Sequence, residues 1–405
     1  MMFWQLTRLP HEYSFLFQSM PRLLSRRHEI IFKWLILMHI TIFGQWTLAQ
    51  LSKGAAKHIT DWKFQRLLMA KYWSVRVFLW WAADMVIAKL PPPQDSVLYI
   101  AVDASTKDKR GSKGPVSQKG KTSKHKGYFF GYKFVLLMIS WNGYRIPVDF
   151  ALILPKNHPE YQKENKLFRD MLSRVGQRIP AWAKKVIVIG DAAYASKENM
   201  KYIKKLDKRD PDRRWGYVLA LPKTWKLENG HKKLSDLVKH TPKRYYQRTC
   251  IPPLSTGKSR RSFYLFEKRT ALAHLGEVTV ILSKKGRNVG PKQTKILVTN
   301  LPELSARQVL MVYKRRWPIE IVFKELKSYL GLGQHQVSKS ESQVEKSVGV
   351  SIIAYLILLR ARYQEIKPRE PWSILRLKNS FTWEVYHQQV KHTLNLKFKK
   401  YDKAA

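Results

Sequence analysis

Apolar runs and amphipathic stretches alternate along this chain in an order that predicts an α/β core. Residues 97–103 and 185–191 are each a continuous apolar run that closes on an aspartate, which is typical of a buried strand. Two further strand-like runs lie in 128–154 and are joined by the Asn142-Gly143 dipeptide, a strong hairpin signal. Helices are predicted over 165–177 and 192–206.

The order strand, hairpin, helix, strand is the one expected of a ribonuclease-H-like layer sandwich, with a mixed sheet flanked by helices. In that fold the first and fourth strands are neighbours, so Asp103 and Asp191 should lie close together at the ends of adjacent strands. Residues 216–221 are predicted to form the last strand of that sheet, and 295–299 should return the chain to it.

The region before residue 94 contains half of the tryptophans, and we expect these rings to pack in a helical bundle. Thr47 and Thr60 are predicted N-caps of two short helices around Gly54. Two such helices resemble a helix-turn-helix, although many helical bundles share the pattern.

The cationic stretch 105–127 is predicted to be a mobile loop. Residues 222–294 form a predicted insertion with strand-like pieces at 244–251, 262–272 and 277–282. The predicted parts are an N-terminal helical DNA-binding domain (1–94), the first part of a catalytic core (95–221), a β-rich insertion (222–296), the second part of the core (297–366) and a basic C-terminal segment (367–405).

The charge points to a polyanionic partner. Lysine and arginine number 75 against 29 acids, which leaves a net charge of +46. Such an excess is typical of a nucleic-acid-binding protein, and a membrane surface is the second candidate. The apolar runs 30–43 and 348–359 are shorter than the roughly 20 residues of a spanning helix, so we expect buried helices and a soluble chain. Cys250 is the single cysteine, which fits a reducing compartment such as the bacterial cytoplasm.

The stretch 313–327 places Tyr313, Arg316, Glu320 and Lys327 within an arc of roughly 60° if it forms one continuous helix. Pro318 favours a second arrangement, in which a new helix begins at the proline and Glu320 lies in its first turn. The alternative without function is an ordinary amphipathic helix with solvated charges.

Asp103, Asp191 and Glu320 together make a candidate carboxylate triad. Three oxygen donors on rigid elements suit a hard cation, Mg²⁺ or Mn²⁺. Two such ions about 3.5–4 Å apart can activate an attacking oxygen and stabilise the leaving oxygen of a phosphodiester. Other acids are weaker candidates: Asp95 lies in a proline-rich linker, Asp149 lies inside a strand run, and Glu325 points roughly 140° away from Glu320.

The spacing Tyr313-x2-Arg316-x3-Glu320-x6-Lys327 resembles the YREK signature of bacterial insertion-sequence transposases of the DDE type. Asp103 and Asp191, each after an apolar strand, look like the aspartate boxes of that family. The gap of 129 residues between Asp191 and Glu320 is similar to the subgroup with a β-rich insertion. The resemblance implies that the three acids bind metal and that Tyr313, Arg316 and Lys327 contact transposon-end DNA.

Members with this insertion use an aromatic residue there to trap a flipped base, and Trp225, Tyr245 and Tyr246 are candidates, each equally well explained by packing. The hypothesis is a transposase that cuts double-stranded DNA at element ends and joins them to a target, as a homodimer. The alternatives are a ribonuclease-H-like nuclease or resolvase without strand transfer, and a DNA-binding derivative without catalysis.

Overall fold

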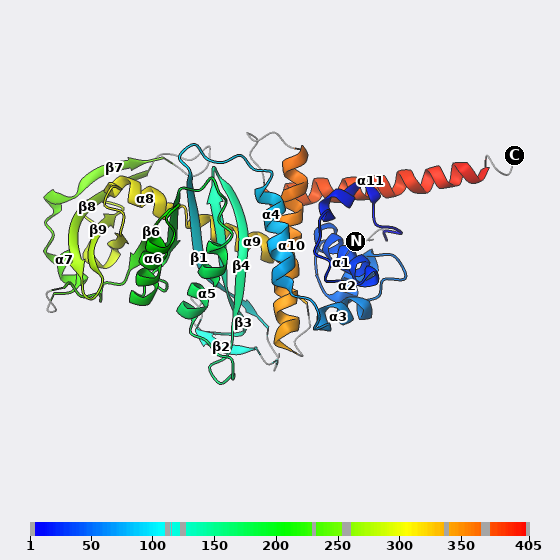
Figure 1. Cartoon of the computed structure of the whole chain (residues 1–405), viewed down its shortest axis with the longest axis horizontal. Coiled ribbons are helices and arrows are strands. Elements are labelled where there is room, and N and C mark those ends of the chain that lie inside the picture. The colour runs from blue at the N-terminus through cyan, green and yellow to red at the C-terminus, as the bar shows by residue number, and fades with distance from the viewer. Residues whose placement is uncertain are drawn as a thin grey trace.

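A large mixed sheet forms the centre of the molecule, with helices against its faces and beyond one end (Figure 1). This computed structural model describes residues 5–109, 114, 116–121, 127–228, 232–252, 261–335, 340–365 and 373–401. The strands are β1 (Val97–Asp108), β2 (Gln118–Lys121), β3 (Tyr128–Trp141), β4 (Tyr144–Ile153), β5 (Lys185–Gly190), β6 (Arg214–Leu221), β7 (Gln247–Ile251), β8 (Arg261–Leu272), β9 (Gly276–Lys284) and β10 (Lys295–Thr299). The helices are α1 (Arg26–Thr41), α2 (Leu48–Gly54), α3 (Asp61–Met69), α4 (Val75–Ile87), α5 (Glu164–Gly176), α6 (Lys197–Arg209), α7 (Leu234–His240), α8 (Ala306–Lys314), α9 (Trp317–Tyr329), α10 (Glu341–Glu365) and α11 (Ile374–Tyr401).

The strand order confirms the predicted fold class. The sheet runs β2-β3-β1-β5-β6-β10-β9-β8-β7, and β4 also pairs with β3. β1 is parallel to β5 and antiparallel to β3, and β5 is parallel to β6. The first and fourth predicted strands are therefore neighbours, as a ribonuclease-H-like fold requires. The hairpin turn falls at the predicted dipeptide, where Asn142 and Gly143 both have positive φ.

The strands of the insertion extend the core sheet and form no separate sheet among the described residues. β10 pairs with β6 on one side and with β9 on the other, and β8 and β7 follow outward. An unpaired edge exposes a row of backbone donors and acceptors, so adding these strands satisfies the edge that β10 would otherwise leave open.

The prediction of a loop over 105–127 was wrong for two parts of that stretch. β1 continues to Asp108, and Gln118–Lys121 forms β2. Both strands pair with the first residues of β3, which supplies backbone partners that the local composition does not reveal. Residues 110–113, 115 and 122–126 of the predicted loop lie outside the described residues.

Helices α1 to α3 form a bundle at the end of the molecule opposite the insertion strands (Figure 1). Thr47 caps α2 by accepting a hydrogen bond from the Gln50 backbone N–H, as predicted. Trp34, Trp46 and Trp73 are buried, but Trp62 on α3 is 57% exposed, so the expectation that every ring packs inside was wrong for it. Trp4 lies outside the described residues.

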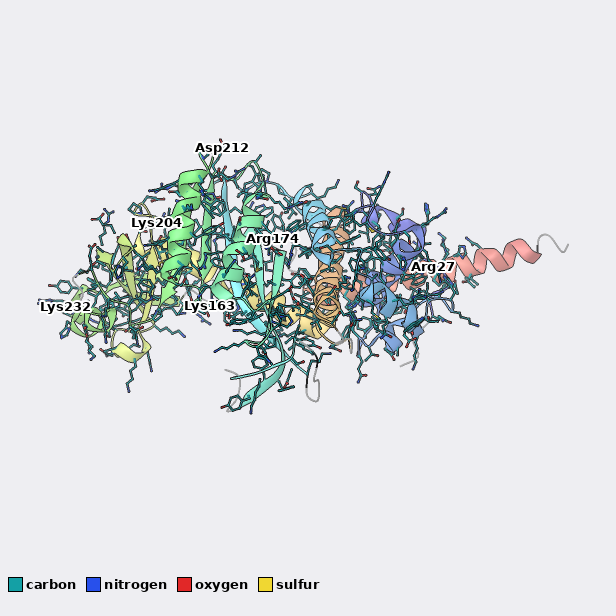
Figure 2. The ribbon with its side chains drawn as sticks, turned by 60° about the horizontal axis from the view of Figure 1, so that its bottom comes forward. Arg27, Lys163, Arg174, Lys204, Asp212 and Lys232 are labelled. Carbon is teal, nitrogen blue, oxygen red and sulfur yellow. The ribbon has the colours of Figure 1, made fainter. Side chains whose placement is uncertain are left out.

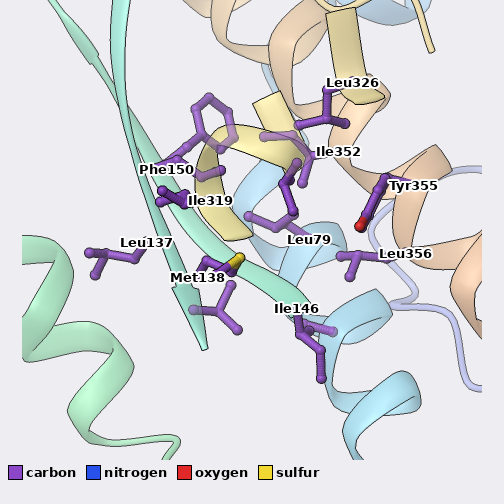
Figure 3. Packing of buried hydrophobic residues seen from close by; sticks show 14 of the residues in the cluster. Leu79, Leu137, Met138, Ile146, Phe150, Ile319, Leu326, Ile352, Tyr355 and Leu356 are labelled. Atoms are coloured by element: carbon purple, nitrogen blue, oxygen red, sulfur yellow. The ribbon is translucent and has the colours of Figure 1, made fainter. Parts of the chain in front are cut away.

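Helices α4 and α10 lie between this bundle and the sheet (Figure 1). Leu79 of α4 and Ile352 and Leu356 of α10 pack with Met138 and Ile146 of the hairpin β3–β4 (Figure 3). The apolar run 348–359 is thus a buried part of α10, as predicted. Among the described residues, no helix is long and apolar enough to cross a membrane.

Candidate active site

Asp103 and Asp191 occupy equivalent positions on two adjacent parallel strands. The last aligned pair of β1 and β5 is Ala101 with Ile189, and each aspartate lies two residues further on. Residues two apart on a strand face the same side, so the two carboxylates leave the same face of the sheet. The prediction that strand order would bring these acids together is confirmed by this register.

The turn after β5 holds Asp191 in place. Its Oδ1 accepts a hydrogen bond of 2.9 Å from the Ala193 backbone N–H. Tyr194, which is buried, anchors the same turn through its hydroxyl, which donates to Glu164 Oε1 at 2.7 Å. The helix predicted from residue 192 begins only at Lys197, because these residues form the turn instead.

Glu320 approaches the aspartates from a separate helix. The stretch 313–327 is broken: α8 ends at Lys314 and α9 begins at Trp317, with Pro318 in its first turn. The proline-initiated arrangement is therefore the one that forms, and Glu320 lies in the first turn of α9. Its side chain is 34% exposed, which leaves it room to change rotamer.

Arg316 joins two of the three acids. Its Nη1 donates to Asp103 Oδ2 at 2.8 Å, and its Nη2 donates to Glu320 Oε1. One guanidinium therefore contacts both carboxylates, which places Glu320 near Asp103. Burial raises the pKa of Asp103 to about 6, with the Arg316 charge opposing this shift and the negative charges of Asp191 and Glu320 adding to it.

Lys327 and Tyr313 lie in different surroundings. Lys327 Nζ donates to Ser105 Oγ at 2.6 Å and to the Thr106 carbonyl at 2.7 Å, so it links α9 to β1 just beyond Asp103. Tyr313 is buried at the end of α8, and Lys295 Nζ lies 4.7 Å from its ring centroid. Tyr313 is in α8, Arg316 lies between the two helices, and Glu320 and Lys327 are in α9, so the four signature residues do not form one stripe.

Carboxylate oxygens are the ligands that a hard divalent cation prefers. In this structure two of the three carboxylates are placed close together, and the third is further away. Asp103 and Asp191 lie side by side, and Glu320 is one guanidinium away from Asp103. Within the described part of the chain, no three His, Cys, Asp or Glu side chains are placed to hold one ion. Arg316 supplies the positive charge between Asp103 and Glu320 in this arrangement.

The acids that sequence analysis set aside have structural partners. Asp149 is fully buried and accepts hydrogen bonds from Arg76 and Arg174. Glu325 is buried beside Arg145 and accepts a hydrogen bond from the Tyr355 hydroxyl at 3.2 Å. Asp95 Oδ1 accepts from the Val97 backbone N–H, which stabilises the turn before β1.

The aromatic candidates in the insertion differ in exposure. Tyr245 is 52% exposed, whereas Tyr246 is buried with Lys284 Nζ 3.9 Å from its ring centroid. Trp225 is half-buried against the core. Exposure alone therefore favours Tyr245 for an external ligand.

Comparison with known proteins adds to this geometry. Residues 98–357 match the family described as "Transposase DDE domain". The chain belongs to this DDE transposase family. The matched region includes both strand-end aspartates and Glu320, and so it covers the site described above.

A protein of Synechocystis sp. (strain ATCC 27184 / PCC 6803 / Kazusa), named as a transposase for insertion sequence element IS4SA, is 39% identical over 69 residues. That match covers 15% of this chain and 20% of the relative, so the chain spans about a fifth of that protein. Among solved structures, a cryo-EM structure of the piggyBac transposase synaptic complex with hairpin DNA is similar with a TM-score of 0.47. It is 9% identical, and the match covers 94% of this chain and 77% of that chain.

Two features of the site were not predicted from the sequence: the Arg316 bridge between Asp103 and Glu320, and the strands that continue beyond Asp103. The signal for the bridge was weak, since an arginine four residues before a glutamate is common on helices. The signal for the strands was the alternation of Ser105 and Lys107 with other residues in β1, and of Tyr128 and Phe130 in β3.

Proposed function

We propose that this DDE transposase cuts double-stranded DNA at the ends of an insertion sequence and joins the freed 3′ hydroxyl groups to target DNA. Asp103, Asp191 and Glu320 would hold two Mg²⁺ or Mn²⁺ ions. The observation that supports this proposal is twofold: Asp103 and Asp191 lie at matching positions on adjacent parallel strands, and one guanidinium links Asp103 to Glu320 of α9.

The ions supply activation of the attacking oxygen and stabilisation of the leaving oxygen in phosphodiester transfer. The chain supplies the placement of the acids. β1 holds Asp103, the turn after β5 holds Asp191, and the Lys327 bonds to Ser105 and Thr106 fix α9 against β1. Glu320 would turn away from Arg316 toward the aspartates when the site is filled, since its side chain is partly exposed.

When Glu320 turns away, Arg316 Nη2 would contact a DNA phosphate while Nη1 stays on Asp103. Lys327 would contact DNA while it keeps its bonds to Ser105 and Thr106. Tyr313 would act on DNA only through the position of α8, because its ring is buried. A homodimer on DNA is part of the proposal, since two ends must be held together for joining. The protein would work at the bacterial nucleoid, in the cytoplasm.

The test uses pre-cut element ends, a target duplex and Mg²⁺, with Asp103→Asn, Asp191→Asn and Glu320→Gln as variants. We expect each variant to lose joining by at least about a hundredfold, since even indirect partners of metal ligands cost 10–100-fold when removed. Thermal shift on adding Mn²⁺ gives a second readout, and we expect a smaller shift in each variant than in the parent protein. Asp170→Asn, an exposed acid on α5, is the control and should behave as the parent.

Nicks without joined product in the parent protein would favour a nuclease or resolvase. DNA binding with no cutting in any divalent cation would favour a derivative without catalysis. Full activity in Asp103→Asn would contradict the proposed site.

A further inference from the structure

A part of the sheet projects past the candidate active site and carries lysines and exposed aromatic rings. We call it the ribbon. It consists of residues 104–109, which end β1 and follow it, of strand β2, and of residues 128–132 at the start of β3. Lys107 pairs with Tyr132, and Lys119 of β2 pairs with Phe130. The ribbon begins directly after Asp103, so whatever lies along it also reaches the acids.

The lysines and the rings share the face of the sheet that bears Asp103. Residues two apart on a strand face the same side, and residues directly opposite in an antiparallel pair share a face. Asp103 and Lys107 on β1 are therefore on one face with Phe130 and Tyr128 on β3, and with Lys119 on β2. α9 lies on this face, because Lys327 reaches Ser105 Oγ and the Phe323 ring contacts the Phe134 ring.

Two aromatic rings on this face, those of Tyr128 and Phe130, are exposed to solvent, and a lysine lies next to one of them. Tyr128 is 58% exposed and Phe130 is 38% exposed. Lys119 Nζ lies 4.6 Å from the Tyr128 ring centroid. Asp108, on the opposite side of β1, accepts from the Phe130 backbone N–H, and apart from Asp103 the described residues of the ribbon's ring-bearing face include no acid.

Rings interleaved with lysines suit a nucleic acid whose bases are unstacked. A paired duplex presents phosphates to such a surface but hides the faces of its bases, whereas unpaired bases can stack on exposed rings. We propose that the ribbon binds unpaired bases of the DNA strand that passes Asp103, with Tyr128 and Phe130 as stacking surfaces and Lys119 at the phosphates. This inference rests on the proposed function, since it takes Asp103 as the place of cutting.

The test measures binding of the full chain to two DNA ends in the absence of divalent cations. One end is fully paired, and the other has a short unpaired tail that contains 2-aminopurine, whose fluorescence falls when it stacks on an aromatic ring. We expect the parent protein to quench this fluorescence. Tyr128→Ala/Phe130→Ala should abolish the quenching and weaken tail binding by about tenfold or more, with the fully paired end bound as before.

Trp383→Ala is the matched control, because Trp383 is an exposed ring (77%) on α11, away from the ribbon, and should change neither measurement. Lys119→Gln should weaken binding to both ends and reduce the salt dependence. A melting temperature of the double variant equal to that of the parent shows that folding is intact, as expected for two exposed side chains.

In the Tyr128→Ala/Phe130→Ala double variant, equal loss of affinity for both DNA ends would show that the two rings contact duplex DNA, and unchanged affinity for both would remove their role in DNA binding. A double variant that shifts from dimer to monomer in sedimentation would make this face an interface between copies. All three outcomes overturn the inference. Repeating the quenching in Asp103→Asn separates it from the proposed function, because stacking does not require a cutting-competent site.

Discussion

Asp103 and Asp149 are both aspartates in strands of one sheet, and their surroundings separate a site acid from a structural one. Asp149 is fully buried between two arginines, with Arg76 Nε at 3.2 Å and Arg174 Nε at 2.9 Å. Asp103 has one arginine partner and two acidic neighbours, and its carboxyl reaches the surface. A buried acid whose charge is fully compensated has no capacity left for a cation.

We predict that Asp149→Asn lowers the free energy of unfolding by about 3–5 kcal/mol, because it removes the carboxylate partner of Arg174 and one of the two carboxylate partners of Arg76, which keeps Glu345. Chemical denaturation measures this loss. Asp170→Asn removes an exposed partner of Lys166 and should cost less than about 1 kcal/mol. If Asp149→Asn loses no more unfolding free energy than Asp170→Asn, the ion pairs of Asp149 with Arg76 and Arg174 contribute little to stability. DNA joining by both variants should match the parent at temperatures where all are folded.

At the scale of elements, a buried histidine pair joins α1 to the segment after α9. His39 Nε2 and His335 Nε2 lie 2.8 Å apart, and His39 Nδ1 contacts the Leu330 carbonyl at 3.0 Å. Burial lowers the pKa of His39 to about 4, and that of His335 lies well below its usual range. Lys378 of α11 and Lys109 are the cations that face this pair.

The pair should make stability depend on pH in a defined window. Between about pH 6.5 and 4 the unfolded chain binds protons on these histidines and the folded chain does not, so stability falls as the pH falls through that window. Lys378, whose pKa burial lowers to about 7, is mostly protonated in both states in this window and adds slope only near its upper end.

We predict that His335→Gln flattens the dependence of the unfolding free energy on pH between 6.5 and 4. Glutamine can still hydrogen-bond His39, and the His335 Nδ1 atom has no partner among the described residues, so little else is lost. Denaturation at several pH values measures the slope. His240→Gln, at an exposed histidine, should retain the parent slope, and an unchanged slope in His335→Gln would contradict the prediction.

At the scale of the whole molecule, positive charge is spread from end to end. Positively charged side chains lie on the N-terminal bundle, the core and the insertion, and examples are Arg27, Lys163, Lys204 and Lys232 (Figure 2). At a net charge of +46, the like charges of the free protein repel one another, and a bound polyanion reduces this repulsion. Because the charges lie along an elongated body, DNA can contact many of them at once.

We predict that DNA affinity falls by roughly 10³-fold or more between 50 and 200 mM salt, as expected when many phosphates are contacted. Fluorescence anisotropy with an end-sequence duplex measures this slope. A fully paired duplex of unrelated sequence serves as the control and should show a similar slope, since phosphate contacts carry no sequence information. A nearly flat titration would argue against an extended DNA surface.

Much of the fold could be predicted because local signals and burial agree. The strand runs of β1 and β5, the Asn142-Gly143 hairpin and the helix start at Pro318 each depend on a few adjacent residues. Residues 105–108 and β2 could not be predicted, since their strand conformation depends on pairing with β3. The exposure of Trp62 likewise depends on which neighbours α3 meets, and composition says nothing about that.

The sequence alone determined which residues are candidates for the chemistry: the aspartates that end two apolar runs, Asp103 and Asp191, and a glutamate at a helix start. It also determined the excess of positive charge. These are local properties, set by covalent order and side-chain type. Only the tertiary structure decided that Arg316 bridges Asp103 and Glu320, that Tyr313 is buried, and that the lysines and rings of the ribbon share the face of Asp103. Such relations depend on strand register and helix packing, which join residues far apart in the chain and leave no mark in any one stretch of it.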